Sequence, residues 1–515
     1  MSERQDRSLG QLLPEAARGR GEKTVLIFGD RSISYAELDE RARRAAATFD
    51  ALGLRKGDRV AVMLGNVPEF IEVLHGAWRL GLVVAPLNVM LTPEEAGYVL
   101  ADADARTAVV DPALLPTVLA VRDRIPGLHS VLVTGPGATA PGTRSYEEAM
   151  SAAGGHPPVE VTENDIALLQ YTAGTTAAPK GAVLTHGNLL ANLDQMDSVP
   201  ALEQAESDVV LLVLPLFHIY ALNVVLGITI RRGATAVLVE RFDPVDTLDL
   251  IQRHNVTVVF GAPPMFTAWL AAAEGRDVDL SSVRIAVSGA APLPGQILEA
   301  FRERLGVTIW EGYGLTETAP AVTTNALGEE AKADSIGLVL PGVDVRLVDE
   351  HGDDVEDGDP GEILVRGPNV FGGYWNRPEE SNGSFLGEWF RTGDVAYRDE
   401  DGYLFIVDRK KDLIIVSGFN VFPKEVEDVI AQHPKVAECA VVGVPDERTG
   451  EAVKALVVLA ADESATEEEI AEHCRGSLAR FKCPTEVELV ASLPKHVTGK
   501  VLRRALRDVD AEAEA

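Results

Sequence analysis

The 515-residue chain is too long to fold around one hydrophobic core, so we expect at least two domains. Its 46% hydrophobic content is that of a globular protein, and its formal net charge of −32 argues against nucleic acid or an anionic membrane surface as a partner. Any polyanionic ligand must therefore be held by local lysines, arginines and backbone N–H groups.

Strands and helices alternate through the first part of the chain, which predicts an α/β layer with a mostly parallel sheet. We expect strands at residues 25–28, 32–35, 60–64, 83–86, 108–110, 130–133 and 166–169, with helices at 35–52 and 67–80. Further strands are expected at 234–239, 256–260 and 283–288, with a helix at 244–254 between the first two.

Beyond Gly337 the sequence pattern changes to short predicted strands, as at 343–348 and 361–365, separated by acidic turns. That pattern predicts an antiparallel or barrel-like subdomain. From about Arg409 we expect a small α/β unit with strands near 437–442 and 454–459 and a helix at 467–478.

One segment, 209–230, contains no Asp, Glu, Lys or Arg over 22 residues and is long enough to span a bilayer. Pro215, His218 and Asn223 interrupt it, and polar groups are costly at mid-bilayer. We therefore predict a buried strand at 209–214 and a buried helix from about Tyr220, with transmembrane insertion as the alternative.

The compartment is indicated by the cysteines and by the start of the chain. The three cysteines, Cys439, Cys474 and Cys483, show neither zinc-site nor disulfide-framework spacing. Residues 1–7 are charged and lack the apolar core of a signal peptide. We expect a cytoplasmic protein.

A loop of small residues and hydroxyls with one lysine, residues 172–181, leaves the buried strand at 166–169. Such a loop presents backbone N–H groups and a cation to phosphate. It is not a P-loop, because Pro179 precedes Lys180 and Gly181 follows it, where that motif needs Gly and Ser or Thr. Taken alone, an ordinary Gly/Thr-rich surface turn explains it equally well.

This loop resembles the phosphate-binding signature of the adenylate-forming superfamily, which includes acyl-CoA synthetases, aryl-CoA ligases, adenylation domains and luciferases. Other segments resemble the family's further motifs in the same order, at 288–292, 310–318, 389–394, 408–423 and 494–500. The resemblance implies an α/β fold with a large N-terminal domain, residues 1–408, made of two α/β subdomains and a distorted β-barrel. It also implies a small mobile C-terminal α/β domain, residues 409–515.

The resemblance implies a role for each matching residue around ATP. Tyr313 would stack on adenine, Thr316 would contact the α-phosphate, and Glu317 would bind Mg²⁺, in keeping with the preference of that cation for carboxylate oxygen. Asp394 would accept hydrogen bonds from the ribose hydroxyls, with Arg409 beside it. The remaining residues implied to bind the nucleotide are Thr172, Gly174, Thr175, Thr176, Lys180, Gly289, Ala290 and Gly312.

The same resemblance implies two half-reactions that use ATP, Mg²⁺ and coenzyme A. Lys500 would reach the substrate carboxylate and the α-phosphate during adenylation, and Lys411 would be the hinge about which the small domain turns. Gly418 would let the thiol arm approach closely. His218 would lie between the acyl pocket and the thiol channel, although a core histidine is the competing interpretation.

The substrate class is predicted from apolar segments at 217–226, 261–269 and 319–322, which offer no charged partner for an ammonium or a second carboxylate. Segment 408–423 is most similar to that of bacterial medium- to long-chain fatty acyl-CoA synthetases. Some long-chain members carry a gating Trp where this chain has Leu222, which leaves the chain length open.

Three alternatives remain: an aryl-CoA ligase of the coumarate or benzoate type, a fatty acyl-AMP ligase that loads a carrier protein, and a non-enzymatic nucleotide-binding relative. Intact Lys500 and Glu317 argue against the last. The expected partners are a carboxylic acid, ATP and CoA, without nucleic acid or integral membrane association. A homodimer stays open.

The phosphate loop departs from the family pattern at Ala173, where Ser is common, and at Ala177, where Gly is common. The first change removes a hydroxyl, and the second restricts a backbone that a positive φ would suit. We therefore expect the double variant Ala173→Ser with Ala177→Gly to have a lower Michaelis constant for ATP in steady-state kinetics. An unchanged constant would show that both departures are neutral.

Overall fold

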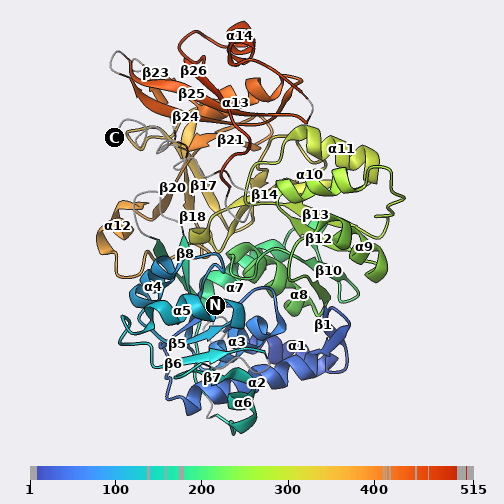
Figure 1. Ribbon diagram of the computed structural model, residues 1–515, viewed down its shortest axis with the longest axis vertical. Helices are drawn as coiled ribbons and strands as arrows, with labels where there is room; N and C mark the ends of the chain where they lie inside the picture. The colour runs from blue at the N-terminus through green and yellow to red at the C-terminus, as the bar shows by residue number, and fades with distance from the viewer. Residues whose placement is uncertain are drawn as a thin grey trace. The chain divides into compact units, whose positions relative to one another are not determined.

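The computed structural model describes residues 8–135, 140–156, 159–172, 179–409, 412, 414–416, 419–446, 449–461, 463–495, 501 and 506 (Figure 1). The chain divides into two compact units. The first unit holds residues up to Asp344 together with Arg366–Phe390, and the second holds Val345–Val365 together with the chain from Arg391 onward. The domain boundary expected after residue 408 stays a prediction.

One sheet of the first unit has the strand order β7-β6-β5-β3-β4-β8-β9. Its strands run parallel except for the antiparallel pair β8 and β9. Apolar side chains of this sheet pack on helices α4 and α5 to form a core. The strands are β3 (Arg59–Met63), β4 (Val83–Pro86), β5 (Ala105–Val110), β6 (Ser130–Val133), β7 (Arg144–Ser145), β8 (Ile166–Thr172) and β9 (Lys180–Thr185).

The other sheet of the first unit has the order β16-β15-β14-β13-β12-β10-β11-β1-β2. Strand β1 pairs in parallel with β11, so the predicted N-terminal hairpin is the edge of a sheet whose other strands come much later in the chain. The strands are β1 (Thr24–Phe28), β2 (Arg31–Ser34), β10 (Val209–Leu212), β11 (Thr235–Leu238), β12 (Val258–Gly261), β13 (Ile285–Ser288), β14 (Ile309–Gly314), β15 (Ala321–Thr324) and β16 (Leu338–Val339).

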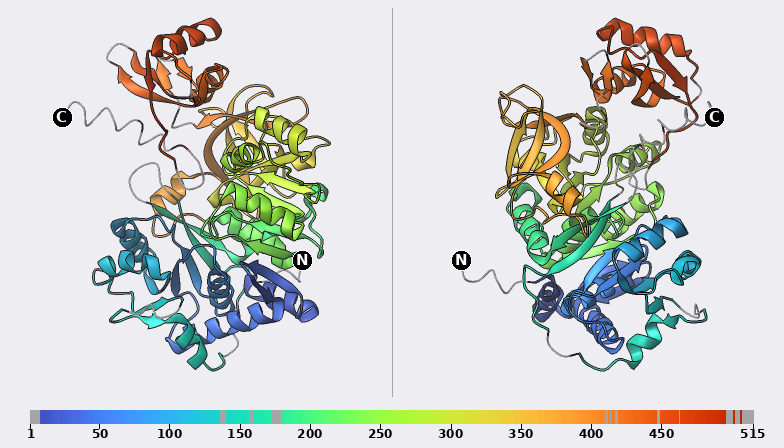
Figure 2. Two further views of the ribbon diagram at one scale, coloured as in Figure 1. Left: turned by 45° about the vertical axis from the view of Figure 1, so that its right-hand side comes forward. Right: turned by 90° about the vertical axis from the view of Figure 1, so that its left-hand side faces the viewer.

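Helices cover these sheets. Helices α9, α10 and α11 pack on strands of the second sheet around the buried Trp269 (Figure 1), and α2 lies along α3 (Figure 2). The helices of the first unit are α1 (Leu12–Arg20), α2 (Tyr35–Ala51), α3 (Pro68–Arg79), α4 (Pro93–Asp102), α5 (Leu115–Arg122), α6 (Tyr146–Ala152), α7 (His186–Asp197), α8 (Ile228–Arg232), α9 (Pro244–His254), α10 (Pro263–Ala272), α11 (Gly295–Leu305) and α12 (Pro378–Gly383).

The uncharged segment 209–230 forms the buried strand β10, then a π-helix, η4 (Tyr220–Gly227), that continues into α8. The predicted strand and helix are thus confirmed. Among the residues that the structure describes, no helix is long and apolar enough to cross a membrane.

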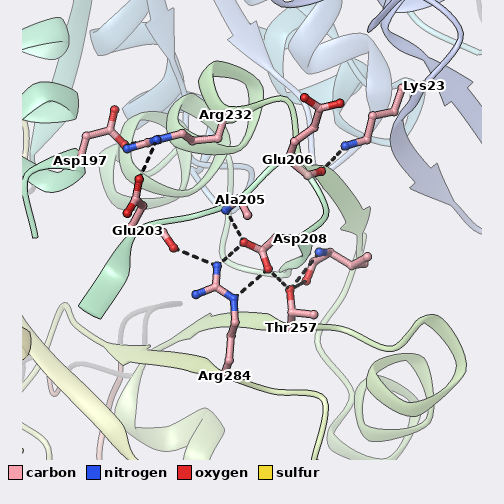
Figure 3. Close-up of polar contacts among 10 residues, drawn as sticks. Lys23, Asp197, Glu203, Ala205, Glu206, Asp208, Arg232, Thr257 and Arg284 are labelled. Carbon is pink, nitrogen blue, oxygen red and sulfur yellow. Dashed lines mark hydrogen bonds and ion pairs between the residues drawn. The ribbon is translucent and has the colours of Figure 1, made fainter. Parts of the chain in front are cut away.

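A polar network ties together the amino ends of strands in the second sheet (Figure 3). Asp208, just before β10, accepts hydrogen bonds from Ala205 N at 2.6 Å, Thr257 Oγ1 at 2.7 Å and Arg284 Nε at 2.9 Å. Thr257 precedes β12 and Arg284 precedes β13, so one buried carboxylate fixes three neighbouring segments. The pKa of Asp208 is lowered, because these hydrogen bonds together with the guanidinium outweigh the effect of burial.

The second unit contains two sheets. In one, β17 (Asp344–Val348), β18 (Gly361–Arg366) and β20 (Trp389–Arg398) lie in order, and β21 (Leu404–Arg409) pairs with β20. The other has the order β23-β22-β25-β24, with β26 on β25, and packs on two helices. Its elements are β22 (Ile414–Val416), β23 (Phe419–Val421), α13 (Pro423–Ala431), β24 (Val436–Asp446), β25 (Gly450–Leu459), α14 (Glu467–Ser477) and β26 (Glu486–Leu489). The short β19 (Phe385–Leu386) belongs to the first unit.

Two histidines are buried in the first unit, His75 on α3 and His186 at the start of α7. Burial lowers the pKa of His75 to about 3 and that of His186 to about 4. His186 Nδ1 accepts a hydrogen bond from Leu9 N at 3.2 Å, so the folded protein holds this ring neutral.

We expect these two rings to make the folded protein less stable as the pH is lowered. In the unfolded chain they titrate near pH 6.5, so below that value the unfolded state binds more protons than the folded state. Each ring should remove about 1.4 kcal/mol of unfolding free energy between about pH 7.5 and pH 5.5. His186→Asn keeps an acceptor for Leu9 N. Urea titrations at both pH values should show that the variant loses less unfolding free energy between them, by that amount. An equal loss in the variant and the unaltered protein would contradict the assignment of His186 as a neutral buried ring.

Candidate active site

The carboxyl ends of parallel strands β10, β12, β13 and β14 lie at one edge of the second sheet. Ligands of open α/β sheets bind at this edge. Three segments with predicted site residues leave these ends: 213–218 after β10, 289–293 after β13, and 312–318 at the end of β14.

The ends of the phosphate loop are described, and residues 173–178 between them are not. Thr172 on β8 lies opposite Lys180 on β9 in the antiparallel pair, so the loop is closed at its base. The Lys180 ammonium lies over the ring of Tyr374, with Nζ 5.4 Å from the ring centroid. The predicted Gly174, Thr175 and Thr176 fall outside the described residues.

Glu317 lies in a single turn, η5 (Thr316–Thr318), and is 8% exposed. Its Oε1 accepts a hydrogen bond from the Tyr374 hydroxyl at 2.8 Å, and its carbonyl accepts one from Phe371 N at 2.8 Å. Burial and the nearby Glu317 charge raise the pKa of Tyr374, which keeps its hydroxyl protonated as a donor. Glu317 is therefore held by one hydrogen bond to its side chain and one to its backbone.

Two of the predicted adenine-side residues directly follow strand β13, and the other two lie on the adjacent strand β14. Gly289 N donates to Gly261 O at 3.1 Å, and a Cβ at Gly289 would lie 3.1 Å from the ring of Tyr220. Ala290 has a left-handed backbone, with φ of 71°. Gly312 and Tyr313 lie on β14, which pairs with β13 on one side and β15 on the other. A side chain at Gly289 would thus press against the Tyr220 ring.

His218 follows β10 in a segment fixed by two buried amides. Gln170 Nε2 donates to Phe217 O at 2.8 Å, which ties this segment to β8. Asn66 accepts from Leu216 N at 2.8 Å and donates to Leu214 O at 3.0 Å. His218 Nδ1 accepts from Tyr220 N at 3.3 Å. This ring is thus held by local backbone.

Asn66, Gln170 and Tyr374 were not predicted from the sequence. Gln170 lies on β8, just before the phosphate loop, and Asn66 follows β3 with no motif around it. Tyr374 is the one of the three that the sequence could have indicated. It follows two consecutive glycines, Gly372 and Gly373, which mark an unusual backbone conformation, and Gly373 has a φ of 129°.

Asp394 belongs to the second unit, where it is buried on β20. Its backbone partner across the β20–β21 pair is Arg409, so the predicted neighbours lie directly opposite each other. The side chain of Arg409 and all of Lys411, Gly418 and Lys500 fall outside the described residues. Their predicted roles stay predictions.

Within the first unit, contacts link the predicted residues into one region. Gln170 joins β8 to the His218 segment, Tyr220 joins that segment to Gly289, and Tyr374 joins Lys180 to Glu317. The structure therefore connects Lys180, on β9 of one sheet, with His218, Gly289 and the buried Glu317, which follow strands of the other sheet. Such a set can bind a phosphate group, a cation and a flat ring.

Comparison with known proteins identifies the class. The model of the AMP-binding enzyme family matches residues 13–375, and that of the AMP-binding enzyme C-terminal domain matches residues 425–500. A long-chain-fatty-acid–CoA ligase of Yersinia pestis is 39% identical, covering 97% of this chain and 94% of its own. A feruloyl-CoA synthase of Amycolatopsis is 38% identical, covering 98% and 99%.

A solved structure shows the same fold. ATP-bound MatB from Rhodopseudomonas palustris superposes with a TM-score of 0.91 at 33% identity, covering 98% of this chain and 100% of its own. The enzyme class is that of the AMP-forming acid–thiol ligases. The chain belongs to the AMP-binding enzyme family.

Proposed function

We propose that this ligase activates medium- to long-chain fatty acids with ATP and transfers the acyl group to coenzyme A. The observation that carries the substrate class is the segment 216–226 around His218, which has no charged side chain. The side-chain amide of Asn223 in this segment bonds to the protein itself, since its Nδ2 donates to Leu189 O at 3.1 Å and to Ala319 O at 2.8 Å. An aliphatic acyl chain suits such a surface, whereas an amino acid or a diacid would lack a partner.

In the proposed first half-reaction, the substrate carboxylate attacks the α-phosphorus of ATP, and pyrophosphate leaves. Both reactants are anionic, so the protein must offset charge that builds in the transition state. Lys180, Thr316 and Lys500 are assigned to that task, with the loop residues Thr172, Gly174, Thr175 and Thr176 holding the phosphates. Tyr313 and Gly312 with Gly289 and Ala290 would hold adenine, and Asp394 with Arg409 would hold ribose.

The proposed cation site fits Mg²⁺. Among the described residues, no group of three or more His, Cys, Asp or Glu side chains could hold a metal ion by itself. Mg²⁺ usually takes one or two protein carboxylates and completes its shell with substrate phosphates and water. Glu317 would be that carboxylate, and the bound cation would supply positive charge beside the phosphates.

In the proposed second half-reaction, the thiol of coenzyme A attacks the acyl carbonyl of the adenylate, and AMP leaves. The C-terminal part of the chain would first turn about Lys411, withdrawing Lys500 and bringing Gly418 toward the thiol arm. His218 would lie between the acyl group and the incoming thiol.

An aryl-CoA ligase is the second candidate, and the observation that favours it is the similarity to a feruloyl-CoA synthase at 38% identity, close to that of the fatty acid ligase. The test is ATP- and CoA-dependent turnover of purified protein on short- to long-chain fatty acids, benzoate and cinnamates. Thioesters from aliphatic acids would support the proposal and fix the chain length. A preference for aromatic acids would favour the second candidate, and adenylate without thioester would indicate a carrier-protein acceptor.

A further inference from the structure

The segment 371–375 connects two parts of the proposed site that are far apart in sequence. On one side Trp375 N donates to Gly181 O at 2.8 Å and Gly373 O accepts from Val183 N at 3.0 Å, so the segment lies along β9. On the other side Phe371 N donates to Glu317 O. This segment, which we call the 371–375 strap, therefore fixes the start of β9 relative to the turn that carries Glu317.

The side chain of Tyr374 repeats this connection. Its hydroxyl donates to Glu317 Oε1 at 2.8 Å, and its ring lies beneath the Lys180 ammonium. The Tyr374 backbone is held because its N donates to Ser381 Oγ at 2.8 Å, and the Phe371 ring packs edge-on against the Tyr374 ring with the centroids 4.9 Å apart. One partly buried side chain thus contacts the cation at the base of the phosphate loop and the carboxylate assigned to the metal.

A tyrosine suits this position for two physical reasons. Its hydroxyl occupies one oxygen of Glu317, which fixes the orientation of the carboxylate and directs its remaining coordination capacity toward a ligand. Its ring face attracts the Lys180 ammonium without neutralising it, as a carboxylate would. Lysine and glutamate, which would otherwise attract each other, can in this way be presented separately to a nucleotide and to a cation.

We propose that Tyr374 is a positioning residue for adenylation, which holds Glu317 for the divalent cation and seats Lys180 for the phosphates. This inference rests on the proposed function. It assigns the two effects to different parts of one side chain, the hydroxyl to the cation and the ring to the phosphates. The two parts can be removed separately.

The test is the variant Tyr374→Phe, which loses the hydroxyl and keeps the ring. We expect the half-saturating Mg²⁺ concentration in ATP–pyrophosphate exchange to rise about 10- to 100-fold, the range typical for groups that orient metal ligands. The Michaelis constant for ATP should change little. Electron paramagnetic resonance with Mn²⁺ and ATP should show a similar loss of cation affinity without any turnover. Tyr374→Leu, which also removes the ring, should raise the Michaelis constant for ATP as well.

The matched control is Tyr146→Phe. The Tyr146 hydroxyl also donates to a carboxylate, Glu72 Oε2 at 3.3 Å, but Tyr146 is fully buried and lies on α6 in no predicted motif. Its exchange activity and Mn²⁺ affinity should equal those of the unaltered protein.

The possible outcomes test the proposed function and the role of Tyr374 separately. No exchange by the unaltered protein with any acid would refute the proposed function. Normal exchange by the unaltered protein, with Tyr374→Phe matching it in Mg²⁺ dependence and Mn²⁺ affinity, would overturn the role of Tyr374. If Tyr374→Phe does not fold by circular dichroism, Tyr374→His takes its place, because its ring is too short to reach Glu317 Oε1. A loss of cation affinity is then the expected result, and affinity equal to that of the unaltered protein would overturn the role of Tyr374.

Discussion

Lys500→Ala should reduce adenylation by about 100- to 1,000-fold, the effect of removing one preorganised group from a charged transition state. A carboxylate and a triphosphate repel each other, and the protein's net charge of −32 adds to that unfavourable field. In its proposed role, Lys500 would contact both reacting groups and offset the charge where it develops. The measurement is ATP–pyrophosphate exchange with a fatty acid, in parallel with thioester formation from a synthetic acyl-adenylate.

The second assay gives the prediction its specificity. If Lys500 withdraws after the first step, thioester formation from the supplied adenylate should remain near that of the unaltered protein. Equal losses in both assays would contradict an adenylation-specific role, and unchanged exchange would exclude the residue from the reaction.

A control lysine from the same unit is Lys435. Its Nζ pairs with Glu469 Oε1 at 2.9 Å in a partly exposed ion pair, which is worth at most about 1 kcal/mol. Lys435→Ala should therefore leave both assays unchanged. This comparison separates the loss of a particular lysine from the loss of one positive charge in a strongly acidic protein.

Much of the fold could be predicted because its strands are short apolar runs bounded by Gly and Pro. The predicted strands at 83–86 and 130–133 and the helix at 244–254 match β4, β6 and α9 in their bounds. Buried parallel strands are continuous apolar runs, and Asp243 caps α9 with Pro244 at its first position, so both signals are local.

Features that depend on partners distant in sequence could not be predicted. Strand β9 begins with Lys180 and Gly181, residues with low strand preference, and it is defined by pairing with β8 and by contact with the 371–375 strap. The pairing of β1 with β11 likewise joins segments about 200 residues apart, and no local pattern encodes it.

The residues of the candidate site also fall into those with a local sequence motif and those that depend on partners distant in the sequence. The motifs located Lys180, His218, Gly289 and Glu317. The structure places the last three at one edge of the second sheet and connects β8 and β9, the latter carrying Lys180, to them through Gln170 and Tyr374. The groups that hold these residues, Asn66, Gln170 and Tyr374, act through hydrogen bonds whose partners lie 47 to 150 residues away in the sequence. The hydrogen-bond partner of an amide or a phenol cannot be read from the sequence around it, so these roles become visible only in three dimensions.

Gly314→Ala is expected to have the largest effect on the fold near Glu317. Gly314 ends β14, and a Cβ there would lie 1.9 Å from Pro320 O and 2.6 Å from Pro320 C. Both are backbone atoms of the chain reversal into β15, where Leu315 N donates to Pro320 O at 3.0 Å. The added methyl group must therefore separate β14 from β15, and this movement would displace the turn that carries Glu317.

We expect Gly314→Ala to lose about 3 kcal/mol of unfolding free energy, at the upper end of ordinary overpacking because backbone cannot rotate away, and to lose ATP–pyrophosphate exchange in any fraction that folds. Urea denaturation gives the first quantity. Gly312→Ala on the same strand is the stability control, since its Cβ would meet Thr323 O at 3.4 Å, an ordinary contact. Equal denaturation midpoints for the two variants would contradict the clash, because a helix or strand preference alone would affect both positions alike.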